Sequence, residues 1–125
     1  MAQVPPVPHA PRPIGPYSVA ADVGGLVFIS GQVAIDPESG QKVEGDAAAQ
    51  AARIMENLRA ILGDLGLGLE AVAKTTIFLT DMADFAAVNE VYKGYFTGSY
   101  PARSTVQVGA LPGGFRVEIE AIAAR

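Results

Sequence analysis

Three charged residues near the C-terminal end of the chain could do chemistry. Arg103 stands in "YPARS", and Glu118 and Glu120 alternate with apolar residues in "VEIEAIA". A guanidinium group binds a carboxylate through two parallel hydrogen bonds, and a glutamate can direct a water molecule as a general base. These residue types therefore suit water attack on a small carboxylate substrate. From the residues alone, the alternative of solvent-facing or ion-paired strand charges stays open.

Other catalytic chemistries lack their partner residues. The chain has no cysteine, which excludes thiol nucleophiles, disulfides and thiolate metal sites. Its one histidine, His9, lies in a proline-rich N-terminal stretch, so neither a serine triad at Ser30 nor a transition-metal site is expected. The segments "GGL", "SGQ" and "PGG" match no nucleotide-binding motif and are interpreted as turns. Lys74 could form a Schiff base but is interpreted as a surface lysine. We expect no metal and no cofactor.

The composition is typical of one globular domain, and we assign residues 1–125 to a single domain. The chain has 125 residues, 50% hydrophobic, and a net charge of -4 with nine scattered Lys and Arg. A negative chain without a basic patch disfavours nucleic-acid binding. The N-terminus has no signal-peptide pattern, and no apolar run is long enough for a membrane span. We expect a soluble, cytoplasmic protein.

The elements that must position these residues follow the order ββαβαββ. An extended segment over residues 1–13 precedes a hairpin turning at Gly24 and Gly25. Apolar residues at helical spacing predict a helix that begins at Asp46, and a second one over residues 81–96 with Asp81 as N-cap. The remaining strands are predicted over residues 71–79, 101–111 and 115–123.

Strand alternation predicts a sheet with both helices on one face and a mixed second face. That second face is expected to contain Thr76, Phe78, Thr80, Thr105, Gln107, Glu118 and Ile122. We further expect Arg103 and Glu118 on adjacent strands, sharing this face with Thr105. A mixed face of this kind is often buried by oligomerisation.

Several long motifs also resemble one known family. They are "IGPYS", "FISGQVAIDPESG", "NLRAIL", "KTTIFLTDMADFAAVNEVYKGYF", "YPARS" and "VEIEAIA", in collinear order from about residue 10 to the end. Together they resemble the RidA family of imine/enamine deaminases, the YjgF-like group also labelled L-PSP endoribonucleases. The resemblance implies a chorismate-mutase-like α+β subunit in a homotrimer, with a central barrel, outer helices and active clefts between subunits.

The resemblance also implies a reaction. Family members hydrolyse 2-iminopropanoate and 2-iminobutanoate to 2-oxo acids and ammonia, without a cofactor, and so protect pyridoxal-phosphate enzymes from 2-aminoacrylate. Carried over by motif, Arg103 is expected to clamp the substrate carboxylate and Glu118 to activate the attacking water. Tyr17 is expected to act in the cleft, while no role transfers to Glu120.

Four further positions are implied to bind substrate. Ser30 and Gly31 of "SGQ" are expected to contact the ligand, and Asn89 of "VNEVY" to lie near it. Thr105 occupies a position where some members have cysteine, and it keeps a small polar side chain. Two alternatives stay open: an RNA-directed endoribonuclease or translation inhibitor, and a non-catalytic ligand-binding or chaperone-like trimer.

Overall fold

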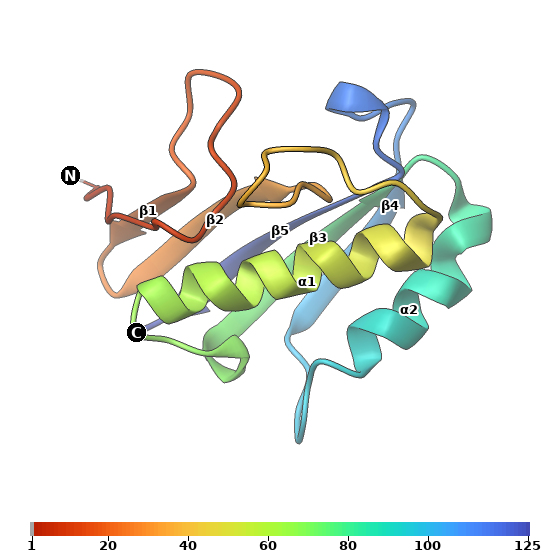
Figure 1. The fold of residues 1–125 in the computed structure, drawn as a ribbon. Coiled ribbons are helices and arrows are strands. Elements are labelled where there is room, and N and C mark those ends of the chain that lie inside the picture. The colour runs from red at the N-terminus through yellow and green to blue at the C-terminus, as the bar shows by residue number, and fades with distance from the viewer. Residues whose placement is uncertain (1) are drawn as a thin grey trace.

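The computed structural model describes residues 2–125, which form a five-stranded sheet and two α-helices (Figure 1). The strands are β1 (Ala20–Val23), β2 (Leu26–Gln32), β3 (Val72–Leu79), β4 (Ala102–Gln107) and β5 (Val117–Ala124). The helices are α1 (Ala47–Asp64) and α2 (Phe85–Lys93), and short 3-10 turns cover Leu69–Ala71, Met82–Asp84 and Pro112–Gly114. The predicted ββαβαββ order and α+β class are confirmed.

The strands lie in the order β1-β2-β5-β3-β4. β3 and β4 are parallel, because the chain returns through α2, and the other neighbouring pairs are antiparallel. The last strand, β5, is thus central, between β2 and β3. The expectation that Arg103 and Glu118 occupy adjacent strands is therefore wrong, since β3 separates β4 from β5.

Both helices cover the same face of the sheet, as predicted (Figure 1). The apolar stripe of α1 is buried and includes Ile54, Leu58 and Ile61, each at most 1% exposed. It packs in one core with alternate residues of β5, among them Val117 and Ile119. This burial supplies the main driving force for folding and fixes which way each β5 side chain points.

The first helix begins at the residue that the sequence predicts. Asp46 is the N-cap, and its side chain accepts a hydrogen bond from the Ala49 amide at 2.9 Å. After the last turn, Gly66 adopts a positive φ of 75° and the Leu67 amide donates to the Leu62 carbonyl.

The second helix is shorter than predicted. Asp81 does act as a cap, but of the 3-10 turn Met82–Asp84, and α2 runs only from Phe85 to Lys93. Gly94 follows as C-cap, which fits its low helix propensity. Tyr95 and Phe96, predicted on the helix, lie beyond its end.

The N-terminal segment packs along the edge of the sheet. Gln3 forms a backbone bridge with Asp22 of β1. The His9 amide donates to Asp64 Oδ2 at 2.8 Å, and its Nδ1 lies 2.6 Å from Asp64 Oδ1. The extended segment predicted over residues 1–13 is thus tied to the body of the chain, except that Met1 lies outside the described residues.

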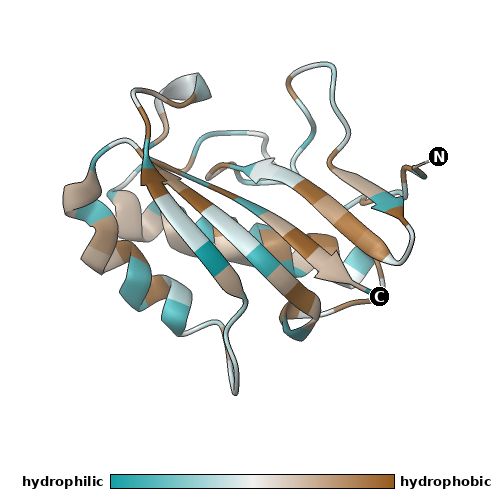
Figure 2. Cartoon of the chain, turned by 180° about the vertical axis from the view of Figure 1, so that it is seen from behind, coloured by the Kyte–Doolittle hydropathy of each residue, from teal (hydrophilic) through white to brown (hydrophobic). Residues whose placement is uncertain are grey.

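No helix within residues 2–125 covers the second face of the sheet (Figure 2). The apolar side chains of this face are exposed at Phe28 and Val106 and half-buried at Phe78 and Ile122. The exposed residue Glu120 lies on the same face. The predicted mixed character of this face is confirmed. Over the same residues, no helix is long and apolar enough to cross a membrane.

Candidate functional site

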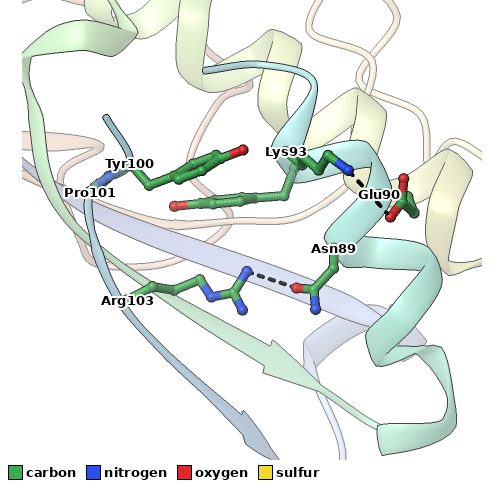
Figure 3. Close-up of a pocket in the computed structure, with 7 residues that line it drawn as sticks. Asn89, Glu90, Lys93, Tyr100, Pro101 and Arg103 are labelled. Carbon is green, nitrogen blue, oxygen red and sulfur yellow. Dashed lines mark hydrogen bonds and ion pairs between the residues drawn. The ribbon is translucent and has the colours of Figure 1, made fainter. Parts of the chain in front are cut away.

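Arg103 is held between β4 and α2. It pairs with Thr75 of β3 in the parallel register, which turns its side chain towards the helices. Its Nη1 donates to Asn89 Oδ1 at 2.8 Å (Figure 3). The Phe85 and Tyr92 rings lie 5.7 and 5.2 Å from its Cζ, within cation–π range. Asn89 thus fixes one nitrogen of the guanidinium, which still has donors to offer a carboxylate.

A cavity of about 400 Å³ lies beside this arginine, between α2 and the edge strand β4. Its lining residues come from α2, from the two residues before β4 and from β4 itself: Asn89, Glu90, Tyr92, Lys93, Tyr100, Pro101 and Arg103 (Figure 3). Two tyrosines and a proline make much of the wall apolar. We call this cavity with Arg103, Asn89 and Thr105 the arginine half-site.

Thr105 belongs to the arginine half-site through the sheet register. It lies opposite Ile77, which is fully buried under the helices, so both side chains point to the helix-covered face. Its Oγ1 is buried and has no hydrogen-bond partner within residues 2–125. Buried hydroxyls are nearly always paired, but Thr105 does not line the cavity, so a ligand reaches this atom only if the surrounding side chains move aside.

Glu118 lines a second cavity, of about 640 Å³, on the other face of the sheet. Its lining residues are mostly apolar: Ile14, Tyr17, Ser30, Gly31, Val33, Ile35, Pro112, Gly113, Phe115, Glu118 and Glu120. Burial raises the pKa of Glu118, and the neighbouring charge of Glu120 raises it further. A raised pKa makes the carboxylate a stronger base. We call this cavity the glutamate half-site.

A β-bulge shapes the floor of the glutamate half-site. Ile29 pairs with Ala121 and Gln32 with Ile119, so Ser30 and Gly31 together oppose the single residue between them. Bulges of this kind re-aim side chains near functional sites. Here the bulge places Gly31 directly against Glu118, and the Ser30 hydroxyl donates to the Ser18 carbonyl at 2.6 Å.

Buried amides of α1 hold the walls of the glutamate half-site. Arg116 lies two residues before Glu118, and its backbone amide donates a hydrogen bond to the side chain of Gln50 at 2.9 Å. Asn57 donates to the Ile35 carbonyl at 2.9 Å. On the outer side, Lys42 donates to the carbonyls of Gly113 and Gly114 at 3.2 and 3.3 Å. Sequence reasoning missed all three side chains, because their partners are backbone atoms far away in the chain.

The expected site residues therefore fall into two groups. Arg103, Asn89 and Thr105 gather on the helix-covered face. Tyr17, Ser30, Gly31 and Glu118 gather at the other cavity, and the two cavities share no lining residue.

The expectation that Arg103, Thr105 and Glu118 share one sheet face is wrong within a single chain. Their neighbours on β3 show why: Arg103 lies opposite Thr75, whereas Glu118 lies opposite Phe78. Residues an odd number of positions apart on a strand point to opposite faces. The same register moves Gln107, opposite Leu79, to the helix-covered face.

The aromatic residues around Arg103 also escaped sequence reasoning as part of the site. Phe85 and Tyr92 fall within the helix predicted over residues 81–96 and were given no site role, yet both rings lie within cation–π range of the guanidinium. Their spacing of seven residues, two helical turns with Asn89 between them, is a signal that could have placed them there. Within residues 2–125, no group of three or more His, Asp and Glu side chains gathers that could hold a metal ion.

Comparisons with known proteins agree with this architecture. Residues 7–125 match the family model described as endoribonuclease L-PSP. Protein DfrA of Myxococcus xanthus is 58% identical over 117 residues, covering 92% of this chain and 89% of the relative. The 2-iminobutanoate/2-iminopropanoate deaminase of Mus musculus is 54% identical over 114 residues, covering 91% and 84%. The crystal structure of RidA from the Antarctic bacterium Psychrobacter is 45% identical with a TM-score of 0.94, covering 98% and 99%.

Proposed function

Because the chain belongs to the endoribonuclease L-PSP family, with its RidA and YjgF-like proteins, we propose that it hydrolyses reactive 2-imino acids. The products would be 2-oxo acids and ammonia. The observation that carries this proposal is the pair of half-sites: an arginine held with free donors, and a half-buried glutamate with a raised pKa. Mammalian relatives named 2-iminobutanoate/2-iminopropanoate deaminase support this substrate class.

The proposed reaction needs only water. Arg103 binds the carboxylate of 2-iminopropanoate or 2-iminobutanoate and so fixes the position of C2. Glu118 accepts a proton from water as the water oxygen bonds to C2 and the C=N bond becomes single. Glu118 then passes this proton to the nitrogen, which gives a neutral carbinolamine. The proton of the new hydroxyl group moves to the nitrogen as the C=O bond forms and the C–N bond breaks, so that ammonia leaves a 2-oxo acid.

We further propose that the two half-sites combine from neighbouring copies in a homotrimer. Arg103 and Glu118 lie on opposite faces of one sheet, so a second copy is the simplest way to bring them together. The exposed apolar residues of the uncovered face, such as Phe28 and Val106, would be buried in the same assembly.

The other expected residues take roles that their positions allow. Tyr17 and Gly31 would line the cleft beside the attacking water, and the Ser30 backbone would contact the ligand, because its hydroxyl hydrogen already goes to Ser18. Asn89 holds Arg103, and Thr105 is proposed as a substrate contact because it shares the helix-covered face of β4 with Arg103.

A ribonuclease function receives less support from the residues. The chain carries a net charge of -4, and its one histidine, His9, is bonded to Asp64 and lines neither half-site. We therefore prefer the deaminase over an RNA-directed activity or translation inhibition.

The proposal is tested by coupling a 2-aminoacrylate-producing dehydratase to the purified protein and trapping residual imine with semicarbazide. Imine should disappear faster with the unaltered protein, and Arg103→Ala should lose at least about 100-fold in kcat/KM. Arg103→Lys, which keeps the charge but not the planar fork, should recover only a small part. If the unaltered protein binds 2-oxo acids without speeding imine loss, a non-catalytic ligand-binding function replaces the proposal.

A further inference from the structure

A buried hydrogen bond lies directly behind Arg103. Thr75 of β3 and Tyr92 of α2 are 1% and 3% exposed, and their hydroxyl oxygens are 2.7 Å apart. The ring of Tyr92 lies 5.2 Å from the Arg103 Cζ. Thr75 is also the residue opposite Arg103 in the β3–β4 register. Three elements therefore meet behind the guanidinium group.

We propose that Thr75 and Tyr92 are positioning residues, whose hydrogen bond fixes the ring that sets the plane of the Arg103 guanidinium. This inference rests on the proposed role of Arg103 as the carboxylate clamp. Neither residue needs to touch substrate, because both act through the arginine.

The need for such support follows from the geometry of the clamp. An arginine side chain has several rotatable bonds, and two-point binding of a carboxylate requires the guanidinium plane in one orientation. The Asn89 bond fixes one nitrogen atom at 2.8 Å but leaves rotation about that contact. An aromatic ring against the guanidinium removes this rotation, provided the ring itself is fixed.

Tyr92 is fixed from two sides. Phe96 packs on it with ring centroids 4.9 Å apart, and Thr75 holds the hydroxyl at its far end. Burial raises the pKa of Tyr92, although the Thr75 bond and the charge of Arg103 oppose this effect. The phenol is therefore neutral at working pH and can share its hydrogen with Thr75. The helix-facing residues Thr75, Ile77 and Leu79 of β3 are buried, so this strand carries the rigidity of the core to Arg103.

The alternative is that the bond only satisfies two buried hydroxyls and stabilises the fold. Steady-state kinetics on the full-length protein separates these roles, since a misaligned clamp weakens substrate binding. Thr75→Val and Tyr92→Phe each remove one hydroxyl and keep the shape of the side chain. Each should raise KM about threefold to tenfold while kcat stays within about twofold.

Three comparisons make the test specific. Thr75→Ser keeps a hydroxyl and should restore KM to near the unaltered value. The double variant Thr75→Val/Tyr92→Phe should be no worse than either single variant, because both changes remove the same bond. Tyr95→Phe is the control: it removes a hydroxyl bonded to Glu56 at 2.7 Å, away from Arg103, and should lower stability without changing KM.

Pyruvate binding, measured by calorimetry, distinguishes failure of this inference from failure of the proposed function. Thr75→Val should weaken the pyruvate Kd by the same factor as KM. If the unaltered protein hydrolyses imine but Thr75→Val and Tyr92→Phe leave KM and Kd unchanged, the positioning role is wrong and the function stands. If the unaltered protein binds pyruvate without hydrolysing imine, the proposed deaminase function is wrong. The positioning role is then decided by whether Thr75→Val and Tyr92→Phe weaken the pyruvate Kd. If it does not bind pyruvate, there is no clamp and the inference is overturned.

Discussion

Gly31 leaves no room for a Cβ atom because the Glu118 carboxylate lies against it. A Cβ at position 31 would lie 2.6 Å from Glu118 Oε2 and 2.7 Å from its Cδ. Both distances are shorter than real Cβ contacts. The absence of a side chain at Gly31 is therefore a condition for the position that Glu118 occupies.

Gly31→Ala should consequently damage the site more than the fold. The atoms it meets belong to the end of a flexible side chain, which can move aside at small cost to stability. Moving the Glu118 carboxylate by about 1 Å should lower kcat/KM about 10- to 100-fold. Activity measured beside thermal unfolding checks this separation.

Gly63→Ala is the matched control for that substitution. Gly63 lies in the last turn of α1, and a Cβ there would meet nothing within 4 Å. The change should raise stability by about 0.5–1 kcal/mol, because alanine is the better helix former, and leave activity unchanged. Full activity of Gly31→Ala would show that the close contact does not fix Glu118 in a productive position.

The local elements of the fold could be predicted from the sequence because their causes are local. The Gly24 and Gly25 turn has positive φ angles of 58° and 83°, which only glycine adopts freely, and Asp46 caps α1 through its own neighbours. The face of α1 buried in the core follows from residue spacing alone.

The arrangement of Arg103 relative to Glu118 could not be predicted in the same way. The predicted alternation within each strand was correct. It does not determine, however, which side of one strand lies on the same face of the sheet as a given side of another strand. That depends on β3 lying between β4 and β5, a long-range pairing set by the α2 crossover. The resemblance named candidate residues and implied clefts between subunits, whereas the sheet register shows that Arg103 and Glu118 lie on opposite faces of one sheet.

The pH dependence of activity should report the charge of Glu120. Its negative charge is one of the two causes that raise the pKa of Glu118, after burial. A base must be deprotonated to act, so kcat/KM should fall as the pH drops through the Glu118 pKa. Glu120→Gln removes the repulsion, lowers that pKa and should move the acid limb to lower pH.

A pH profile of kcat/KM for Glu120→Gln beside the unaltered protein measures this shift. Glu38→Gln serves as the control, since Glu38 is exposed and lines neither half-site. An acid limb that stays in place or moves to higher pH would contradict the assignment of Glu118 as the titrating base.

At neutral pH the charged carboxylate of Glu118 should also lower the free energy of unfolding. A carboxyl group whose pKa is raised in the folded state favours folding when protonated, so its contribution to stability is lost as the pH rises through the folded pKa. Glu118→Gln should therefore raise the thermal midpoint at pH 7, with a smaller gain at pH 4, while abolishing activity. A lower midpoint at pH 7 would indicate that the charged carboxylate makes favourable contacts in the assembled protein.

Two inactive variants should restore each other if neighbouring copies complete the site. Arg103→Ala lacks the clamp and Glu118→Gln lacks the base, but a mixed trimer can join an intact Glu118 to an intact Arg103 of the next copy. With equal, random mixing, about a quarter of the sites receive both intact halves, so about a quarter of the unaltered activity should return. The mixture is made by coexpression or by refolding together and is measured in the semicarbazide assay.

Mixing Arg103→Ala with the double variant Arg103→Ala/Glu118→Gln should restore nothing, because every copy then lacks the clamp. If the first mixture also stays inactive, the two half-sites do not combine across subunits, and Arg103 and Glu118 must be assigned to separate sites.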